Sequence, residues 1–300
     1  MSERSVVTIG NFDGVHRGHQ ELVRRACAHD MPSVGVFFDP HPTAFLAPDR
    51  APALLTEPTR RAELLRAYGL DRVDVRTFDE AFALQAPDAF VRTVLVDAHA
   101  AAHVIVGRDF RFGRDRAGDT DALRRLGREH DFEVEEVAPV LHEGSVVSST
   151  RVRECVESGD VVEASALLGR FHETEGVVVR GDQRGRTIGF PTANLQISGI
   201  VPADGVYAVV CRVLDSETSR VYGVANVGVR PTFRAGRSVE AFLFDFDRDI
   251  YGETLRVGWV QRLRGEVRFD GVEALVAQLN DDVAQAKSIH RGEDARATWI

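Results

Sequence analysis

The sequence predicts an α/β domain built on a doubly wound parallel sheet, followed by an antiparallel β-barrel or sandwich domain that closes with a helix. Three observations indicate this arrangement. The chain has 300 residues, of which 44% are hydrophobic, enough for two domains of ordinary size. Strand-like and helix-like segments alternate in the first half. Strand-like segments separated by turn residues dominate the second half.

In the first half, short β-rich runs alternate with segments of helical period. The expected strands are 6–10, 33–38, 73–78, 103–107 and 132–137, and the expected helices are 17–29, 58–69, 87–99 and 121–130. Ligands of such sheets bind beyond the carboxyl ends of the strands. The segments that follow residues 10, 38 and 107 should therefore point into one crevice.

The second half reads as an antiparallel barrel or sandwich, because its strand-like runs are separated by Gly, Asp and Ser. The expected strands are 175–181, 205–214, 220–229, 239–246 and 255–263, and a closing helix is expected over 272–289. The junction lies in the helical stretch 158–169, which contains no low-complexity linker. We therefore expect one domain over residues 1–169 and a second over residues 170–300.

The charge composition narrows the possible ligands. The formal net charge is -9, which argues against a general nucleic-acid binder, because that class needs a basic face. Lys287 is the only lysine, so cationic contacts to phosphate must come almost entirely from arginine. A phosphate loop of the lysine-bearing type is therefore excluded.

The cysteines and the amino terminus indicate a cytoplasmic protein. Cys27, Cys155 and Cys211 lie far apart and form no CxxC pair, which speaks against a disulfide framework and a zinc site. The apolar run at residues 6–9 is too short for a signal peptide or a membrane span. We expect neither a membrane nor a nucleic acid as a partner.

The first chemical constellation is the segment GNFDGVHRGHQ, which runs from a strand end through a glycine-bearing turn into a helix. Such a turn offers backbone N–H groups and a helix dipole to a phosphate. His16 and His19 stand three apart, which places both imidazoles on one face of the first helical turn. They could stabilise charge during attack on an α-phosphate. The alternative is one capping histidine and one surface histidine.

Three further stretches accompany this segment in order: FFDPHP, GRDFRFG and SSTRVR. Together the four resemble the HxGH nucleotidyltransferases, and more closely the amino-terminal domain of the bacterial bifunctional riboflavin kinase/FAD synthetase family. The resemblance implies a Rossmann-like FMN adenylyltransferase domain in which His16 and His19 are catalytic. Residues expected at ATP or phosphate are Gly10, Phe12, Asp13, Gly14, Gly18, Ser149, Thr150 and Arg153.

Several of these roles have simpler alternatives. Ser149 and Thr150 begin a helix, where plain N-capping would suffice, while Arg153 lies one turn on and could clamp a triphosphate. The residues expected to border the flavin are Asp39, His41, Pro42, Asp109, Phe110 and Phe112. In an unfamiliar protein the two phenylalanines would more often be core.

The second chemical constellation is GDQRGRTIGFPTANL, a glycine-rich loop that enters a strand. Thr192 and Asn194 are two apart, hence on one side of an extended chain, and both offer oxygen ligands suited to Mg²⁺ with nucleotide phosphate. A turn without function is the alternative. Residues expected at ATP in this loop are Gly181, Arg186 and Gly189.

This loop, with NVGVRPTF and VEAFLFDFDRDIYG, resembles the flavokinase part of the same family. The resemblance implies a flavokinase barrel in which Glu240 is the catalytic base that accepts the proton of the ribityl 5′-hydroxyl. Without the motif, Glu240 would read as an outward-facing strand residue. Arg184, Arg186 and Arg230 are candidates for phosphate or flap contacts. Residues 291–300 match nothing that can be assigned.

The resemblance implies two reactions in sequence. Riboflavin and ATP give FMN and ADP in the second domain, and FMN and ATP give FAD and pyrophosphate in the first. Both steps are expected to use Mg²⁺ with ATP. The alternatives are a chain in which only one module is active, and a flavin-binding carrier that consumes no ATP.

Overall fold

The computed structural model describes residues 3–181, 185, 188–214, 216, 220–229 and 237–293. Contacts divide the chain into two compact units, Met1–Ser148 and Ser149–Ile300. Helices α8 (Ser149–Ser158) and α9 (Val161–Leu168) belong to the second unit. The predicted functional division after residue 169 stays a prediction, because compactness and function need not divide a chain at the same residue.

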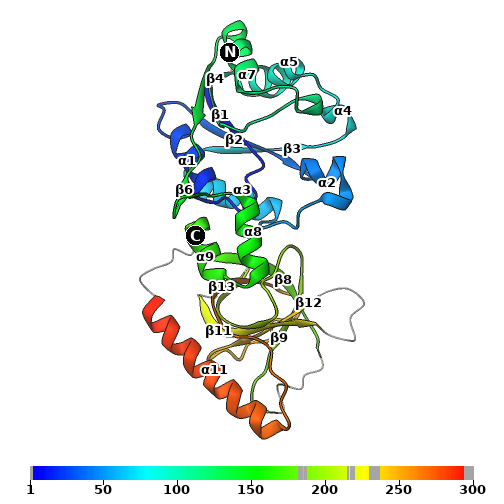
Figure 1. Cartoon of the computed structure of the whole chain (residues 1–300), viewed down its shortest axis with the longest axis vertical. Helices are drawn as coiled ribbons and strands as arrows, with labels where there is room; N and C mark the ends of the chain where they lie inside the picture. Colours follow the sequence, from blue (N-terminus) through cyan, green and yellow to red (C-terminus); the bar gives the residue numbers. More distant parts are fainter. Residues whose placement is uncertain are drawn as a thin grey trace. The chain divides into compact units, whose positions relative to one another are not determined.

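The first unit contains a five-stranded parallel sheet of order β3-β2-β1-β4-β5, as predicted (Figure 1). Its strands are β1 (Ser5–Ile9), β2 (Ser33–Asp39), β3 (Arg72–Thr77), β4 (Ala101–Gly107) and β5 (Glu133–Val137). The chain proceeds outward from β1 to one edge and then from β4 to the other. The order therefore reverses between β1 and β4, where ligands of such sheets bind.

Helices cover both faces of this sheet (Figure 1). On one face α1 (Arg17–Ala26) contacts β1 and β4, and α3 (Pro58–Ala67) contacts β3. On the other, α7 (Thr120–His130) contacts β5 and buries Leu123 and Leu126 in the main core. Shorter helices that the sequence analysis did not list are α2 (Pro42–Leu46), η1 (Pro48–Arg50), α4 (Glu80–Ala83) and η3 (Arg114–Arg116).

The helix expected over 87–99 is divided into three pieces. They are α5 (Pro87–Phe90), the π-helical segment η2 (Val91–Val96) and α6 (Asp97–His99). The Thr93 hydroxyl donates to the carbonyls of Ala89 and Phe90, at 2.9 and 3.4 Å. A hydroxyl that bonds to the helix backbone in this way often bends a helix.

A small hairpin follows the sheet, formed by β6 (Leu141–His142) and β7 (Ser145–Val146). Its two turn residues both have positive φ, 51° at Glu143 and 77° at Gly144. This is the backbone of a type I′ turn, which matches the twist of paired strands. The hairpin was not expected, because each strand has only two residues.

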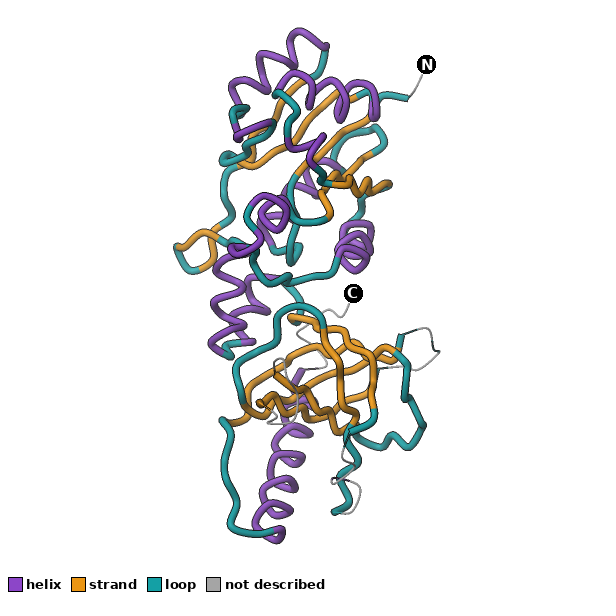
Figure 2. The backbone as a smooth tube through the Cα atoms, turned by 90° about the vertical axis from the view of Figure 1, so that its right-hand side faces the viewer, coloured by secondary structure: helices purple, strands orange, loops and turns teal. Residues whose placement is uncertain are grey.

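The second unit is a closed antiparallel barrel of order β10-β11-β12-β9-β8-β13, which confirms the barrel expectation (Figure 2). Its strands are β8 (His172–Val179), β9 (Ala193–Ile197), β10 (Gly205–Val213), β11 (Val221–Val229), β12 (Arg237–Leu243) and β13 (Thr254–Arg264). Closure pairs every strand on both sides and leaves no open edge.

Alternation along these strands builds two cores. Tyr207, Val209 and Trp259 point into one apolar cluster, and the Trp259 indole donates to the Thr174 hydroxyl at 2.7 Å. Neighbouring residues such as Val210 pack in a second cluster with Ala286 of α11 (Val272–Glu293). The long helix therefore covers one outer side of the barrel, as Figure 2 also shows.

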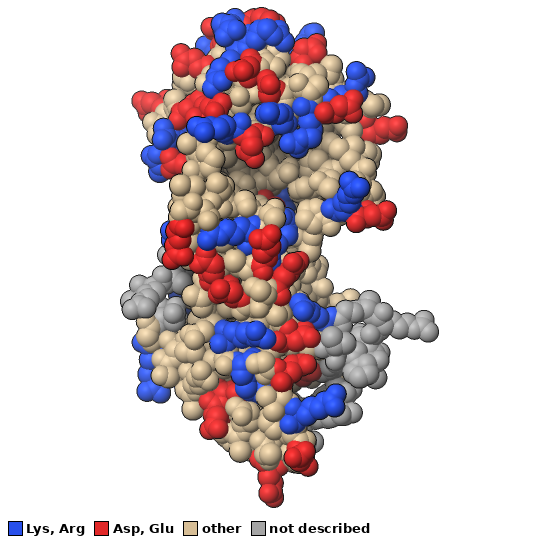
Figure 3. All heavy atoms as spheres, in the orientation of Figure 1, with Lys and Arg blue, Asp and Glu red and all other residues tan. Residues whose placement is uncertain are grey.

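On the face drawn in Figure 3, acidic and basic side chains are interspersed rather than gathered into a patch of one sign. This distribution gives nucleic acid no extended basic surface there. Among the described residues, no helix combines the length and apolar character needed to cross a membrane.

Candidate active sites

The turn between β1 and α1 has a strained backbone. Phe12, Gly14 and Val15 have φ values of 51°, 84° and 42°. Glycine adopts this left-handed region freely, but a β-branched residue such as Val15 is there a genuine outlier. Strained turns persist only where their surroundings hold them, and they occur often at functional sites.

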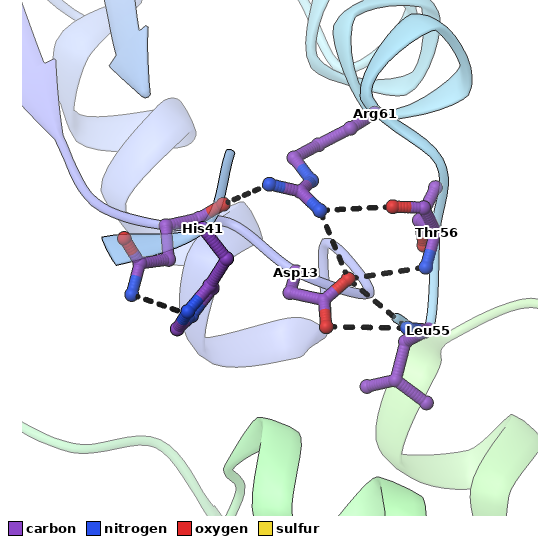
Figure 4. Close-up of polar contacts among 6 residues, drawn as sticks. Asp13, His41, Leu55, Thr56 and Arg61 are labelled. Carbon is purple, nitrogen blue, oxygen red and sulfur yellow. Dashed lines mark hydrogen bonds and ion pairs between the residues drawn. The ribbon is translucent and has the colours of Figure 1, made fainter. Parts of the chain in front are cut away.

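A buried ion pair holds this turn (Figure 4). The Asp13 carboxylate accepts from the backbone N–H groups of Leu55 and Thr56, the latter at 3.0 Å, and from Arg61 at 3.2 Å. Arg61 also donates to the carbonyls of Asn11 and Thr56, each at 2.9 Å. The side chains of Asp13 and Arg61 are 2% and 1% exposed. Asp13 is thus used internally, and a phosphate at this position would meet the backbone.

The two histidines lie together at the start of α1. Their rings are stacked, with centroids 3.6 Å apart and planes 17° from parallel. His16 is the N-cap, and its Nδ1 accepts from the His19 backbone N–H at 3.4 Å. This bond favours the tautomer that carries the proton on Nε2. His16 therefore caps the helix, and its ring also lies beside that of His19 as predicted.

His19 is held in its neutral form. Burial lowers the pKa of His19 well below its ordinary value of 6.5, and the nearby charges of His16 and Arg61 lower it further. The buried Nδ1 of His19 has no hydrogen-bond partner among the described residues. Phe12, itself fully buried, meets the His19 ring edge-on at 5.3 Å. The Phe12 side chain therefore supports His19, and any phosphate contact of Phe12 falls to its backbone.

His41 connects the segment after β2 to the same turn. Its Nδ1 accepts from the Thr43 N–H at 3.2 Å, and its Nε2 lies 3.0 Å from the Asn11 amide (Figure 4). Pro42 is the first residue of α2, and Asp39 is exposed at the end of β2. His41 thus lies beside the strained turn, and Asp39 and Pro42 are its near neighbours in the sequence.

The loop after β4 carries the two phenylalanines expected to border the flavin. Phe112 is 4% exposed and belongs to the main core, with its ring 5.3 Å from that of Phe90. Phe110 stacks on Phe112 with centroids 5.5 Å apart and is less buried. Phe110 is thus the more exposed of the two, and the flavin contacts expected of both stay predictions. Asp109 is exposed in the same loop.

Two glycines and three residues of α8 complete the set expected at ATP or phosphate in the first constellation. Gly10 follows β1 and donates its N–H to the Val36 carbonyl at 3.2 Å. A Cβ at Gly18 would lie 3.1 Å from the His16 ring, tighter than most real contacts. Ser149 and Thr150 open α8 as predicted, and Arg153 lies one turn on, all within the second unit.

The second constellation assembles around β12. Glu240 is paired directly with Asn194 of β9 on one side and with Asn226 of β11 on the other. The Thr192 hydroxyl donates to the Glu240 carboxylate at 3.3 Å. Directly opposed residues of antiparallel strands hold their Cβ atoms about 5 Å apart. The three residues predicted to serve the second reaction are therefore neighbours in space.

Glycines shape the loop that precedes β9. A Cβ at Gly181 would lie 2.4 Å from the Asn194 amide nitrogen, so only glycine lets the backbone approach that side chain. A Cβ at Gly185 would lie 2.1 Å from the Phe190 carbonyl oxygen. Gly189 has φ of 87°. The residues Arg184, Arg186 and Arg230 lie outside the described part of the chain.

Two polar neighbours of these sites were missed from the sequence. Arg61 lies inside a predicted helix. The sequence signal that could have singled it out is a charged residue at a position that the helical period places among buried apolar residues. Asn226 lies within NVGVRPTF, but its place beside Glu240 depends on the register between β11 and β12, which no local pattern reveals.

Family comparisons assign a description to each half. A model of the FAD synthetase family matches residues 1–151, and a model of the riboflavin kinase family matches residues 168–290. A Pseudomonas fluorescens protein named bifunctional riboflavin kinase/FMN adenylyltransferase is 41% identical, covering 95% of this chain and 92% of the relative. A relative of the same name from Escherichia coli (strain K12) is 38% identical with the same coverage.

Among solved structures, one described as a macrolide-efflux protein from Streptococcus pneumoniae is similar throughout. Its TM-score is 0.86 and its sequence identity 36%, covering 96% of this chain and 95% of that one. That description belongs to the Streptococcus protein.

Proposed function

The chain belongs to the family of bifunctional riboflavin kinase/FMN adenylyltransferases, and from that premise we propose which residues carry each reaction. The carboxyl-terminal part phosphorylates riboflavin to FMN, and the amino-terminal part adenylylates FMN to FAD. The observation that carries the assignment of residues is that each family match covers its own constellation. The histidine pair lies in the first match, and Glu240 lies in the second.

For the kinase reaction, Glu240 is the general base. Its carboxylate accepts the proton of the ribityl 5′-hydroxyl as that oxygen attacks the γ-phosphorus of ATP, and ADP leaves. The Thr192 hydroxyl, 3.3 Å away, orients the carboxylate before substrate binds. The strand pairing with Asn194 and Asn226 keeps Glu240 from moving along the barrel.

For the adenylylation, the enzyme supplies position and charge rather than a covalent nucleophile. An FMN phosphate oxygen attacks the α-phosphorus of ATP, and pyrophosphate leaves. The Nε2–H of His16 and the ring of His19 donate to the phosphate oxygens on which charge develops. A neutral His19 suits this role, because a neutral imidazole still carries one N–H group that donates a hydrogen bond. The phosphate roles of Ser149, Thr150 and Arg153 stay predictions.

We propose Mg²⁺ with ATP at Thr192 and Asn194. A hydroxyl and an amide oxygen are hard ligands of the kind this ion takes, and Gly181 lets the loop backbone approach the Asn194 side chain closely. When bound, the ion neutralises charge on the phosphate oxygens. A cytoplasmic location and the absence of a nucleic-acid partner also stay predictions, checked by cell fractionation and by a filter-binding assay.

One experiment tests these assignments, using two variants of the whole chain with riboflavin or FMN, ATP and Mg²⁺. Glu240→Gln should lower FMN formation by about 10²–10⁴-fold, the usual contribution of a positioned base, and leave FAD formation from added FMN intact. His19→Ala should do the reverse. Products are separated by chromatography, and chelation of Mg²⁺ should stop both reactions.

Each variant is the control for the other, because both carry an intact second site. Kinase activity of Glu240→Gln within about tenfold of the unmodified protein would remove Glu240 from the base role. Equal loss of both activities in either variant would point to a folding defect instead.

A further inference from the structure

The strained turn before α1 depends on a residue outside the sequence motif. We infer that Arg61 is a positioning residue for FAD formation, which holds the Asn11–Val15 turn so that His16 and His19 are aimed at the reacting phosphates. The inference rests on the adenylylation role proposed for the histidine pair.

The contacts of Arg61 exclude a direct role at phosphate. One terminal nitrogen donates to the Asn11 carbonyl, and the other donates both to Asp13 and to the Thr56 carbonyl. The guanidinium lies 5.0 Å from the centroid of the Phe37 ring, and the side chain is 1% exposed. The described hydrogen bonds of the guanidinium therefore run to the protein itself.

These contacts of Arg61 join two segments that are far apart in the sequence. Asn11 and Asp13 belong to the strained turn, whereas Thr56 lies just before α3, some 43 residues further along the chain from Asp13. Between them, Phe12, Gly14 and Val15 have positive φ. A turn that pays this conformational cost relaxes when its anchor is lost. The histidine rings follow the turn, because His16 is the N-cap of the helix that begins there.

Arg61 also acts on His19 through its charge. It is the third cause, after burial and His16, that lowers the pKa of His19. A lysine at the same position would keep this charge but not the planar fork, because an ammonium cannot donate to three acceptors in the fixed directions of a guanidinium. The two contributions of Arg61, geometric and electrostatic, can therefore be separated by substitution.

The experiment compares Arg61→Lys and Arg61→Met with Arg66→Met, which removes a guanidinium from the exposed side of the same helix. In Arg61→Lys, kcat for FAD formation from FMN should fall by about 10²-fold, the cost of a misplacement near 1 Å. Riboflavin phosphorylation by the same polypeptide should not change. Arg66→Met should behave as the unmodified protein in both reactions.

A second readout does not depend on activity. The pKa of His19, followed by NMR of ring-labelled protein, should rise in Arg61→Met, where the charge is gone, and stay low in Arg61→Lys. If Arg61→Met does not fold, the neutral pair Asp13→Asn with Arg61→Met replaces it, because no unpaired carboxylate is then buried.

The outcomes separate this inference from the function it rests on. An unmodified protein that makes no FAD would refute the proposed function. A protein that makes FAD normally both before and after Arg61→Lys would overturn the role of Arg61. Failure of Arg61→Lys to fold would also overturn it, since Arg61 would then serve the fold rather than the histidines.

Discussion

Burial of the His19 ring lowers its pKa and so favours the neutral form, and the electrostatic influence of His16 and of Arg61 acts in the same direction. This has a consequence for stability. The pKa of His19 is 6.5 in its ordinary, unfolded state and lower in the folded state. As the pH falls below about 6.5, the unfolded chain takes up a proton that the folded chain cannot, and folding loses free energy.

We therefore expect the first unit to lose stability between pH 7 and 5, and this loss to be smaller in His19→Asn. Trp259 is buried in the second unit, so its fluorescence does not follow the first. Hydrogen exchange of peptides from β1 and β2 gives the measurement. Equal pH dependence in both proteins would show that other groups cause the loss.

At the residue scale, the sequence predicted which side chains lie together where local spacing decides it. His16 and His19 were expected on one helical face, and they are stacked. Thr192 and Asn194 were expected on one side of an extended chain, and Glu240 lies beside both. Phe112 packs in the main core, the alternative that the sequence left open, because a loop phenylalanine gives no local sign of whether it faces the core or a ligand.

At the element scale, α11 is fixed to the barrel by one buried acid. Asp282 is 2% exposed and receives a bidentate contact from Arg264 of β13, with the shortest distance 2.7 Å. The Gln278 amide, one turn earlier, donates to the same carboxylate at 3.0 Å. Bidentate arginine–carboxylate contacts add direction as well as energy, so this pair sets how the helix lies on the barrel.

We expect Asp282→Asn to destabilise the second unit by about 3 kcal/mol, the lower end for loss of one partner of a buried pair, because Arg264 keeps some exposure. Urea unfolding followed by tryptophan fluorescence measures the effect. The exposed neighbour Asp281→Asn is the matched control and should change stability by about 0.5 kcal/mol or less. Equal effects of the two substitutions would mean that the contact between Arg264 and Asp282 contributes nothing to the stability of the second unit.

Elements with strong periodicity were predicted, and irregular ones were not. The five strands of the sheet follow from the alternation of strand-like and helix-like segments along the chain. The closing helix α11 follows from its helical period. The π-helical segment η2 contains a hydroxyl that bonds to the backbone, and the β6–β7 hairpin has only two residues per strand. Such features arise from single contacts, which a pattern over ten residues averages away.

At the scale of the whole molecule, two enzymes share one chain. In the barrel, Glu240, Thr192 and Asn194 come from the second family match, whereas the histidine pair comes from the first. The barrel order β10-β11-β12-β9-β8-β13 could not be predicted, because register between distant strands is set by closure rather than by local sequence. Since FMN is the product of one site and the substrate of the other, it must move between them.

We expect that movement to occur through solution. His19→Ala retains the kinase site and Glu240→Gln retains the adenylylation site, so a mixture of the two proteins with riboflavin and ATP should form FAD after a lag. The lag should shorten as Glu240→Gln is added, because capture of free FMN is then a bimolecular step. Chromatography of timed samples measures it, and a His19→Ala, Glu240→Gln double variant should form no FAD at all. If FMN instead stays bound to His19→Ala and the mixture forms no FAD, although Glu240→Gln converts added FMN, the transfer is confined to a single molecule. The covalent linkage of the two domains would then be part of the catalytic route.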